Sequence, residues 1–486
     1  MSDINLKTIV SQEHRMLIDG ELCDAADAAM VDTINPANGQ VIKQFPDASG
    51  EDLDRAVRSA QSAQPEWASR TLGDRQRCLG EVAEILRQYS AELGALDSLE
   101  NGNVYSHMRH DAEGGAFMAD YFCGIANELK GESTQVDNSL HYSRLEPYGV
   151  VAKLLPFNHP IQSLGSGIAA PLLTGNTVIL KPSPHTALSA LRFGELVKDV
   201  VPRGVINVVS GSNSRAAQGL MEHPGIPRMS VTGSTEVGKM ALRLGAESLK
   251  TTTLELGGKS PVVLGRSADL QKAATRIMAG KTLNAGQICL APEYAFVPQE
   301  KTKEFVGAAT KAVETMFPTG LKDNDDYTSV VNQRHYDRIM SYIEEARDKG
   351  AEVIEINPTG ENFSQQPHHK IPPTIVVEPG EDTKIMQEEI FGPILPVKSY
   401  KSVDEAIGYV NDHDRPLGLY YFGDDAGEES RVINNTTSGG VTVNDVITHI
   451  MQDDAPFGGV GPSGTGAYHG FEGFINFSHA KTIFRQ

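Results

Sequence analysis

The chain has 486 residues, of which 40% are hydrophobic and 22% are charged, so it can bury a large core. At roughly 150 residues per domain, this length predicts two or three domains. The 43 Lys and Arg residues against 63 Asp and Glu give a formal net charge of −20, and such a charge argues against nucleic acid and anionic lipid surfaces as partners.

The cysteine spacing and the N-terminal residues indicate which cellular compartment to expect for this protein. Cys23, Cys78, Cys123 and Cys289 are far apart and form no C-x-x-C pair, which predicts neither a disulfide framework nor a zinc ribbon. The N-terminal residues are polar where a signal peptide needs an apolar run. The uncharged stretch 154–180 is interrupted by Pro, Gly and Asn, whereas a membrane helix needs about 20 mainly apolar residues. We therefore expect a soluble, cytoplasmic protein without a membrane partner.

The first half of the chain predicts helices and then a projecting hairpin. Segments 52–67, 75–93 and 110–129 place apolar residues three and four positions apart, which is typical of amphipathic helices. Between 131 and 148 the residues are short, polar and alternating, which favours a hairpin outside the core. The alternating tail 474–484 is predicted to add a strand to this hairpin or to a partner subunit.

Short β-branched runs alternate with helix-length segments from residue 149 onward. The first four runs are at 149–155, 176–180, 205–209 and 229–233. This alternation predicts βαβ units and a parallel sheet with helices on both faces. Further runs, enough for a second α/β domain, lie at 293–297, 374–378, 392–400, 417–422 and 439–444.

One glycine-containing turn is a candidate phosphate site. Gly233, Gly238 and Lys239 in GSTEVGK resemble a nucleotide-triphosphate loop, but Met240 stands where a magnesium-binding hydroxyl is needed, which disfavours that reading. A turn into a helix N-terminus can still hold the pyrophosphate of a dinucleotide. The pair at 165 and 167 is a weaker candidate because it lacks a third glycine.

Two side chains stand out chemically. Cys289 follows polar, turn-forming residues whose free amides are expected to stabilise a thiolate, whereas the other three cysteines fit small buried hydrophobes. Glu255 lies between two leucines at the end of a predicted strand, where an acid is seldom found unless it is paired or functional. An ion pair at a domain seam is the alternative reading for Glu255. No His, Cys or acidic cluster has a recognised metal-ligand spacing, so we expect no metal.

Seven short motifs in order resemble the NAD(P)-dependent aldehyde dehydrogenase superfamily along nearly the whole chain. They are PFNHP (156–160), LKPSP (180–184), GSTEVGK (233–239), LELGGKSP (254–261), GQIC (286–289), EEIFGP (388–393) and PFGGVGPSG (456–464). The ending is most similar to the branch that contains the class 3 and coniferyl aldehyde dehydrogenases. The motif PFNHP departs from the aromatic W-N-[FY]-P that is usual in the family.

The resemblance implies roles for three catalytic residues. Cys289 would attack the aldehyde carbonyl as a thiolate to give a thiohemiacetal. The Asn158 side-chain amide and the Cys289 backbone N–H would hold the oxyanion. After hydride transfer to NAD(P)+, Glu255 would act as the general base that hydrolyses the thioester to a carboxylate.

The resemblance also implies cofactor contacts. Lys181 and Ser183 would lie by the adenosine ribose, and Glu389 and Phe391 by the nicotinamide ribose. The turn residues Gly233, Ser234 and Gly238 are assigned to the pyrophosphate. Many NAD-preferring members have K-P-S-E where this chain has Pro184, so the acid that would repel a 2′-phosphate is absent. The cofactor is therefore NAD or NADP, and we expect NADP to be at least tolerated.

The family fold implies an α/β protein with a Rossmann-like cofactor domain, an α/β catalytic domain and a small β bridging element. These fit residues 1–130 and 149–254 for cofactor binding, 255–445 for catalysis, and 131–148 with 446–486 for bridging and the tail. The resemblance implies a homodimer or homotetramer, and the ending favours the dimer.

Other functions and the substrate stay open at this level. A CoA-acylating relative is disfavoured because Glu255 is present, and a catalytically silent binding protein because Cys289, Asn158 and Glu255 are all retained. The partner is a small-molecule aldehyde. Tyr121, Phe122 and Phe157 suggest an apolar tunnel for aromatic or long aliphatic aldehydes, although aromatic residues on helices are more often core.

Overall fold

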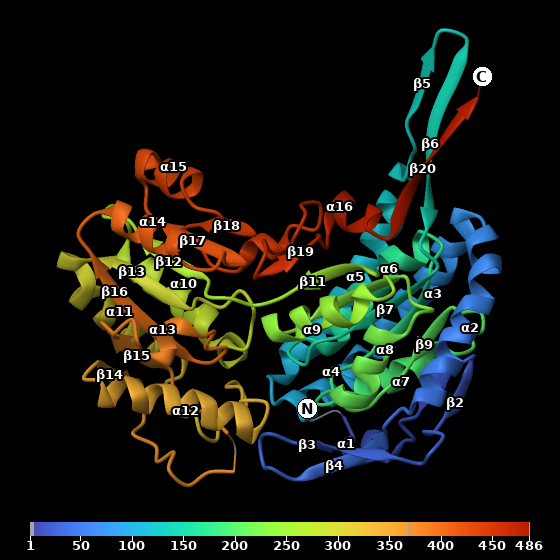
Figure 1. Ribbon diagram of the computed structural model, residues 1–486. Helices are drawn as coiled ribbons and strands as arrows, with labels where there is room; N and C mark the ends of the chain where they lie inside the picture. The colour runs from blue at the N-terminus through green and yellow to red at the C-terminus, as the bar shows by residue number, and fades with distance from the viewer. Residues whose placement is uncertain (1–3, 368, 486) are drawn as a thin grey trace.

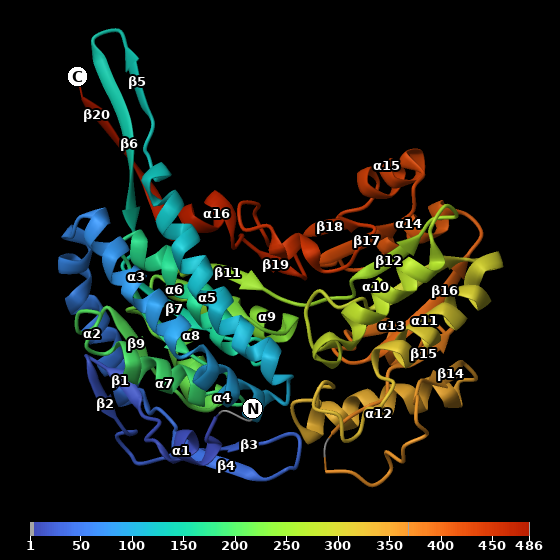
Figure 2. The same cartoon turned by 180° about the vertical axis from the view of Figure 1, so that it is seen from behind.

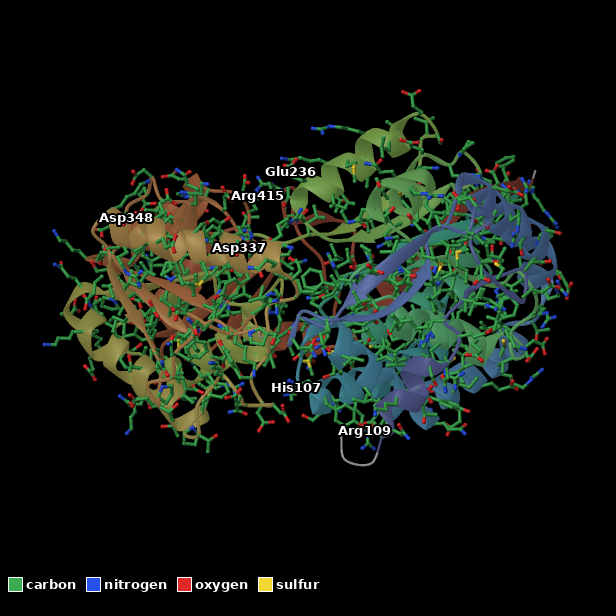
Figure 3. The ribbon with its side chains drawn as sticks, turned by 90° about the horizontal axis from the view of Figure 1, so that it is seen from below. His107, Arg109, Glu236, Asp337, Asp348 and Arg415 are labelled. Carbon is green, nitrogen blue, oxygen red and sulfur yellow. The ribbon has the colours of Figure 1, made fainter. Side chains whose placement is uncertain are left out.

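The computed structural model describes residues 4–367 and 369–485, which form two lobes and a projecting arm (Figure 1). Each lobe is built on its own sheet, and the arm is a third sheet that leaves the first lobe. The view from behind shows the same separation of the lobes (Figure 2). Figure 3 shows both lobes from below, with Arg109 marking the first and Asp348 marking the second.

The first lobe has an eight-stranded sheet with a parallel centre. Strands β9, β8, β7, β10 and β11 are all parallel neighbours, while β1, β2 and β19 pair antiparallel at the two edges. In sheet order the strands are β19 (Gly464–Thr465), β11 (Thr251–Glu255), β10 (Arg228–Thr232), β7 (Val150–Leu154), β8 (Thr177–Lys181), β9 (Ile206–Val208), β1 (Met16–Ile18) and β2 (Glu21–Cys23). The central strands are buried on both faces, which explains their continuous apolar runs. The predicted parallel sheet is confirmed.

Helices cover both faces of this sheet. Their bounds are α1 (Leu6–Ser11), α2 (Gly50–Ser69), α3 (Leu72–Gln88), α4 (Ser90–Asn101), α5 (Tyr105–Ile125), α6 (Pro160–Leu173), α7 (Leu188–Val197), α8 (Gln218–Glu222) and α9 (Thr235–Ala246). A capping box formed by Ser49 and Asp52 starts α2. Where α5 and α6 meet, a Cβ added to Gly165 would lie 2.7 Å from the Cα of Gly115, so glycine is needed for this close approach.

The helical predictions are confirmed, but the structure differs from the sequence analysis in two ways. The predicted helix 52–67 lies within α2, and 110–129 largely within α5, but 75–93 divides into α3 and α4 at Tyr89. Four strands before α2 were not anticipated. Two of them, β3 (Met30–Ile34) and β4 (Val41–Pro46), form a separate antiparallel pair.

The second lobe repeats the α/β arrangement around a seven-stranded sheet. In sheet order its strands are β14 (Glu352–Glu355), β15 (Thr374–Val377), β16 (Ile394–Tyr400), β13 (Tyr294–Pro298), β12 (Pro261–Leu264), β17 (Gly418–Phe422) and β18 (Gly440–Val443). All neighbours are parallel except β14, which pairs antiparallel at one edge. Its helices are α10 (Leu270–Thr282), α11 (Thr302–Met316), α12 (Gln333–Asp348), α13 (Lys384–Gln387), α14 (Val403–Asp412) and α15 (Ala426–Asn434). The second set of predicted strands is confirmed.

The arm combines the predicted hairpin with the C-terminal tail. Strands β5 (Ser133–Val136) and β6 (Ser139–Pro147) form the hairpin, and β20 (Ser478–Arg485) pairs antiparallel with β6 along its length. The three strands project together in Figure 1. Pairing of the tail with the hairpin is therefore confirmed, and before β20 the chain also contributes β19 to the first sheet and forms α16 (Gly470–Ile475).

The carboxyl ends of the parallel strands place the candidate site. Strands β7, β8, β10 and β11 are parallel, and their carboxyl ends, at Leu154, Lys181, Thr232 and Glu255, lie on the same side of the first sheet. In open α/β sheets ligands bind at the carboxyl ends of the strands. No described helix is long and apolar enough to span a membrane, and the stretch 154–180 is a loop, α6 and β8.

Candidate active site

The segment that carries Cys289 lies between α10 and β13 and has a strained backbone. Asn284, Ala285 and Gly286 have φ values of 50°, 49° and 73°, in the left-handed region that Ala seldom adopts. A Cβ on Gly286 would lie 2.3 Å from the carbonyl oxygen of Gly392, so only glycine fits there. Buried strain of this kind persists where surrounding contacts enforce it, and it is concentrated at functional sites.

Gln287 supplies those contacts. Its Nε2 donates to the carbonyls of Asn284 and Ser329, each at 3.1 Å, and its Oε1 accepts from the N–H of Val331 at 3.0 Å. The amide is therefore fully used in fixing the turn two residues before Cys289.

Asn158 is brought to the same segment from the loop between β7 and α6. Its Nδ2 donates to the carbonyl of Gln287 at 3.1 Å, and its Oδ1 accepts from the N–H of His159 at 3.1 Å. The second contact orients the amide, and the first uses only one of its two N–H groups. Asn101 on α4 donates to the carbonyl of Asn158 at 3.4 Å and supports the loop from behind.

Glu255 is the last residue of β11 and is 5% exposed. Neither carboxylate oxygen has a hydrogen-bond partner among the described residues. Burial raises the pKa of Glu255 well above its usual range, against the opposing charge of Lys153. The Glu255 carboxylate lies beside Gly458, where an added Cβ would be 3.4 Å from Oε1, and Cys289 packs against the cluster that contains Phe457, so the two side chains approach the same segment.

The expected activation of Cys289 is not what the protein alone provides. Backbone N–H groups of Cys289 and Leu290 do favour the thiolate, as predicted, but burial and the charges of Glu255 and Glu389 outweigh them and raise the pKa of Cys289 to about 12. The resting side chain is thus a thiol. Bond formation at sulfur therefore requires the thiol proton to leave the side chain.

Lys181 ends β8, and Ser183 follows two residues later, at the carboxyl end of the strand. Lys181 is 2% exposed, and its Nζ contacts Asn213 Oδ1 at 3.3 Å. Burial lowers the pKa of Lys181 to about 7, partly offset by the charge of Asp47. The hydroxyl of Ser183 accepts from the N–H of His185 at 3.2 Å. An ammonium held in this way favours a ligand that supplies additional oxygen acceptors.

The turn after β10 leads into α9 as predicted. Gly233 follows β10 directly, and exposed Ser234 caps α9 by accepting from the N–H of Val237 at 3.4 Å. An exposed helix N-terminus suits a phosphate group. Gly238 lies inside α9, where a Cβ would come within 2.7 Å of the Leu256 side chain, so close packing explains this glycine.

Glu389 and Phe391 come from the loop between α13 and β16. Glu389 Oε1 accepts from the N–H of Gly258 at 3.1 Å, and burial raises the pKa of Glu389 to about 7. A Cβ on Gly257 would lie 2.0 Å from Glu389 Oε1, so that glycine makes room for the carboxylate. Phe391 has a left-handed φ of 47°, and its ring contacts Phe157 edge-on, with 5.9 Å between the centroids.

The sequence analysis missed the residue that positions this loop. Glu293 is 2% exposed and accepts from the N–H groups of Ile390 at 2.7 Å and Phe391 at 3.2 Å. Lys281 and Lys259 pair with its carboxylate and hold its pKa below the usual range despite burial. An acid next to an apolar strand was a signal available for Glu293 as it was for Glu255, although Glu293 precedes its strand and Glu255 ends its own.

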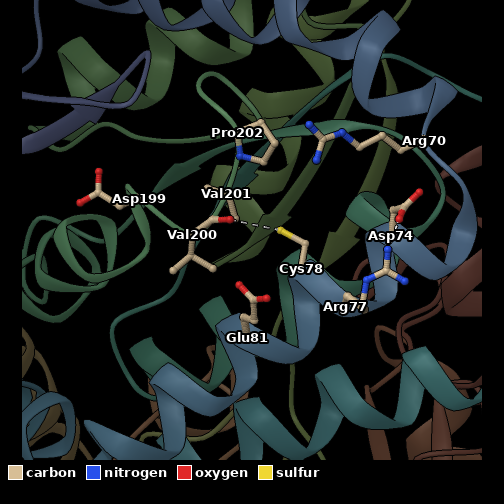
Figure 4. A pocket seen from close by; sticks show the side chains of 9 residues that line it. All are labelled: Arg70, Asp74, Arg77, Cys78, Glu81, Asp199, Val200, Val201 and Pro202. Carbon is tan, nitrogen blue, oxygen red and sulfur yellow. Dashed lines mark hydrogen bonds and ion pairs between the residues drawn. The ribbon is translucent and has the colours of Figure 1, made fainter.

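Other sequence candidates lie outside this cluster. Cys78 lines a separate pocket of about 650 Å³ in the first lobe with Arg70, Asp74 and Pro202, and its thiol faces the Val200 carbonyl at 3.7 Å (Figure 4). Burial raises its pKa to about 11, as expected for an unreactive thiol. Among the described residues no group of three His, Cys, Asp or Glu is placed to hold a metal ion.

The three aromatic residues that were proposed to line a substrate tunnel do not all lie at the candidate site. Phe157 lies at the site, between Phe391, His185 and His335. Phe122 is buried in the first core against Phe474. Tyr121 lines a pocket of about 390 Å³ with Phe471 and Asp454. Core packing therefore explains Phe122.

Comparison with known proteins decides the family. The model of the aldehyde dehydrogenase family matches residues 23–483. The chain belongs to the aldehyde dehydrogenase family. This places it among the dehydrogenases that act on aldehydes and confirms the resemblance drawn from the seven motifs.

Relatives of this aldehyde dehydrogenase include two from the coniferyl branch. This chain is 54% identical over 343 residues to a probable coniferyl aldehyde dehydrogenase of Caulobacter vibrioides, and the match covers 70% of each chain. It is 45% identical over 341 residues to a coniferyl aldehyde dehydrogenase of a Pseudomonas species, again covering 70% of each. Among solved structures, betaine aldehyde dehydrogenase of Staphylococcus aureus in complex with NAD+ superposes with a TM-score of 0.92 at 28% identity, covering 99% of this chain and 96% of that one. The predicted α/β fold class is confirmed.

Proposed function

We propose that this aldehyde dehydrogenase oxidises an aldehyde to a carboxylate through a thioester on Cys289. The observation that carries the proposal is the hydrogen bond from Asn158 to the turn that bears Cys289. The electrostatic effect of Glu255 on the same thiol supports it. These three residues supply the nucleophile, the oxyanion donor and the base that such a reaction needs.

Each proton and bond is accounted for by the chain's own groups and solvent. The proton of the Cys289 thiol passes to solvent as sulfur bonds to the aldehyde carbon, and the carbonyl oxygen becomes an anion. The free N–H of Asn158 and the backbone N–H of Cys289 hold that charge. After the hydride leaves, Glu255 takes a proton from water, the water oxygen bonds to the thioester carbon, and the carbon–sulfur bond breaks to release the carboxylic acid.

A nicotinamide cofactor, when bound, accepts the hydride. The residues present fit it: Lys181 is a buried cation with spare donors, the α9 N-terminus is exposed for phosphate, and Glu389 is held beside Gly257 and Gly258 for ribose hydroxyls. The NAD+ complex of the Staphylococcus aureus structure supports NAD. Pro184 leaves no acid to repel a 2′-phosphate, so we propose that NADP also serves.

The names of the coniferyl relatives support an aromatic aldehyde as substrate. A panel of aromatic and aliphatic aldehydes, followed by absorbance of the reduced cofactor, tests this. We expect coniferaldehyde to have a higher kcat/KM than hexanal, and the opposite order would contradict the assignment.

Assembly and domain roles complete the proposal. We assign cofactor binding to 1–130 with 149–254, catalysis to 255–445, and bridging to 131–148 with 446–486. The arm β5–β6–β20 supports a homodimer, since an exposed sheet edge is a ready pairing surface. Sedimentation at micromolar concentration tests it, and a monomer there would contradict it. We place the protein in the cytoplasm.

Two substitutions test the mechanism. Cys289→Ser is expected to abolish aldehyde oxidation with cofactor binding nearly intact, and Glu255→Gln to leave an acylated enzyme that turns over slowly. Cys123→Ser, a partly buried cysteine on α5, serves as the matched control. Oxidation near the wild-type rate in Cys289→Ser would refute the nucleophile. Rapid transfer of the acyl group to coenzyme A rather than water would favour the CoA-acylating alternative.

A further inference from the structure

A buried polar surface lies on one face of the first sheet, next to Glu255. Lys153 on β7, Ser230 on β10 and Thr253 on β11 are register partners in one row, and Thr232 pairs with Glu255 two residues further along. Directly paired residues point to the same face, and so do residues two apart on one strand. Parallel strands covered on both faces are normally apolar there, so a lysine and a glutamate on this face require an explanation.

Lys153 is enclosed rather than extended to solvent. It is 4% exposed, and its Nζ lies 4.5 Å from the centroid of the Tyr468 ring and 5.4 Å from that of Phe477. Helix α6 passes over it at Gly167, where an added Cβ would lie 3.0 Å from Cε and 3.1 Å from Nζ of the lysine. Any larger side chain at 167 would press on the ammonium, so the fold keeps this space for it.

The charged groups around Lys153 and Glu255 determine how Lys153 acts on the carboxylate. Lys153, Tyr468 and Cys289 interact electrostatically with Glu255, and the lysine is the cation among them. Arg228 and His469 also interact with Lys153. Burial and Arg228 lower the pKa of Lys153 to about 7, and Glu255 opposes that shift. The carboxylate oxygens of Glu255 have no hydrogen-bond partner in the described part of the chain, so the charge of Lys153 is the main influence that favours the ionised form.

We propose that Lys153 is the positioning residue that keeps Glu255 ionised for hydrolysis of the Cys289 thioester. This inference rests on the function proposed above, because it assigns a partner to its general base. Lys153 does not contact the reacting atoms. It acts through Glu255, which must carry a negative charge when it takes the proton from water.

A purely structural role is the alternative, since a buried cation over two aromatic rings also stabilises the fold. The pH dependence separates the two. Removing an opposite charge next to a buried carboxylate raises the pKa of that carboxylate, so hydrolysis would need a higher pH. Loss of packing lowers stability but leaves the midpoint of hydrolysis unchanged.

The experiment follows decay of the acyl-enzyme. Enzyme is mixed with NAD and a limited amount of benzaldehyde, and the mixture is quenched at intervals. The pH is varied from about 5.5 to about 10, a range that extends further above neutrality because an upward shift is expected. The acyl adduct is measured by intact mass. In Lys153→Met we expect the midpoint of the decay rate to move up by about one pH unit or more. The burst of reduced cofactor and the KM for NAD should change less than about three-fold, because hydride transfer precedes the step at which Lys153 acts.

Two variants serve as matched comparisons. Lys153→Arg keeps a positive charge and should not move the midpoint upward. Arg228→Gln removes the other buried cation on this face, which is 2% exposed. Because Arg228 disfavours a proton on Lys153, its loss should leave the midpoint in place or lower it.

The outcomes are distinct. A wild-type midpoint in Lys153→Met, whatever its overall rate, overturns the proposal, and so does an equal upward shift in Arg228→Gln. Should Lys153→Met fail to fold, Lys153→Gln carries the same expectation. Absence of any acyl adduct on Cys289 in the wild type would instead count against the proposed function.

Discussion

The side-chain amide of Asn158 donates to the main-chain carbonyl of Gln287 over 3.1 Å. This single bond ties the loop after β7 in the first sheet to the turn before Cys289, which leads into the second sheet. The proposed oxyanion donor and the proposed nucleophile are therefore held in a fixed relation even though 131 positions separate them along the chain (289 − 158). Preorganised donors of this kind do not have to reorient as charge develops.

Replacing Asn158 tests this relation. Asn158→Ala should lower kcat about 100-fold to 1,000-fold, the usual effect of losing one oxyanion donor. The KM for NAD should change little, because Lys181 and Glu389 are untouched. Steady-state kinetics with an aromatic aldehyde provide the measurement, and a loss of kcat below about ten-fold would show that Asn158 is not the main donor.

The space at Gly257 is predicted to control cofactor binding. A methyl group there would lie 2.0 Å from Glu389 Oε1, so Gly257→Ala should displace that carboxylate. We expect kcat/KM for NAD to fall about ten-fold or more, since a shift of an ångström in a positioning group costs up to about 100-fold. Gly307→Ala on α11, where a Cβ meets nothing within 4 Å, is the control. Unchanged kinetics in Gly257→Ala would remove Glu389 from the cofactor site.

Lys181 should matter for both cofactors. Lys181→Met removes a charged donor, which is worth about 1.5–3 kcal/mol, so the KM for NAD should rise roughly ten-fold to 150-fold. Lys239→Met changes an exposed lysine on α9 and should have little effect. The wild type should also turn over with saturating NADP, because Pro184 offers no repulsion. Undetectable turnover with NADP would contradict that expectation.

Glu100 is predicted to be a stability residue rather than a catalytic one. Its carboxyl group accepts from the Thr33 hydroxyl at 2.8 Å and from the N–H groups of Ala187 and Leu188, at 3.1 and 2.9 Å, where α7 begins. Glu100→Ala leaves three buried donors without an acceptor, so the free energy of unfolding should fall by about 3 kcal/mol. Urea denaturation measures this against Glu84→Ala, whose side chain is 70% exposed. Equal stability of the two variants would contradict the capping role.

Much of the fold follows from local pattern. Three- and four-residue spacing predicted α2 and α5, because burial of one helix face places apolar residues at that spacing. The β-branched runs predicted the central strands of both sheets, because a strand buried on both faces is apolar along its whole length. The four short strands before α2 left no such record: β2 has no buried residue, β3 has only one, and β1 and β2 have only three residues each. The alternating tail was predicted to add a strand to the hairpin or to a partner subunit, and the structure pairs β20 with β6.

For the candidate site, too, the sequence identified some features and only the structure supplied the others. The sequence by itself determined which residue types stand at strand ends and turns, and so singled out Cys289 and Glu255, while the family resemblance added Asn158 and Lys181. Only the tertiary structure decided their charge states, because a pKa depends on burial and on neighbours that are distant in sequence. Burial and nearby carboxylates raise the pKa of Cys289, against the expected activation of the thiol, and the tertiary structure places Glu293 against the loop that carries Glu389 and Lys153 on the same sheet face as Glu255. A local pattern records which face of an element is buried, whereas the partner across that face is set by how the strands and helices pack.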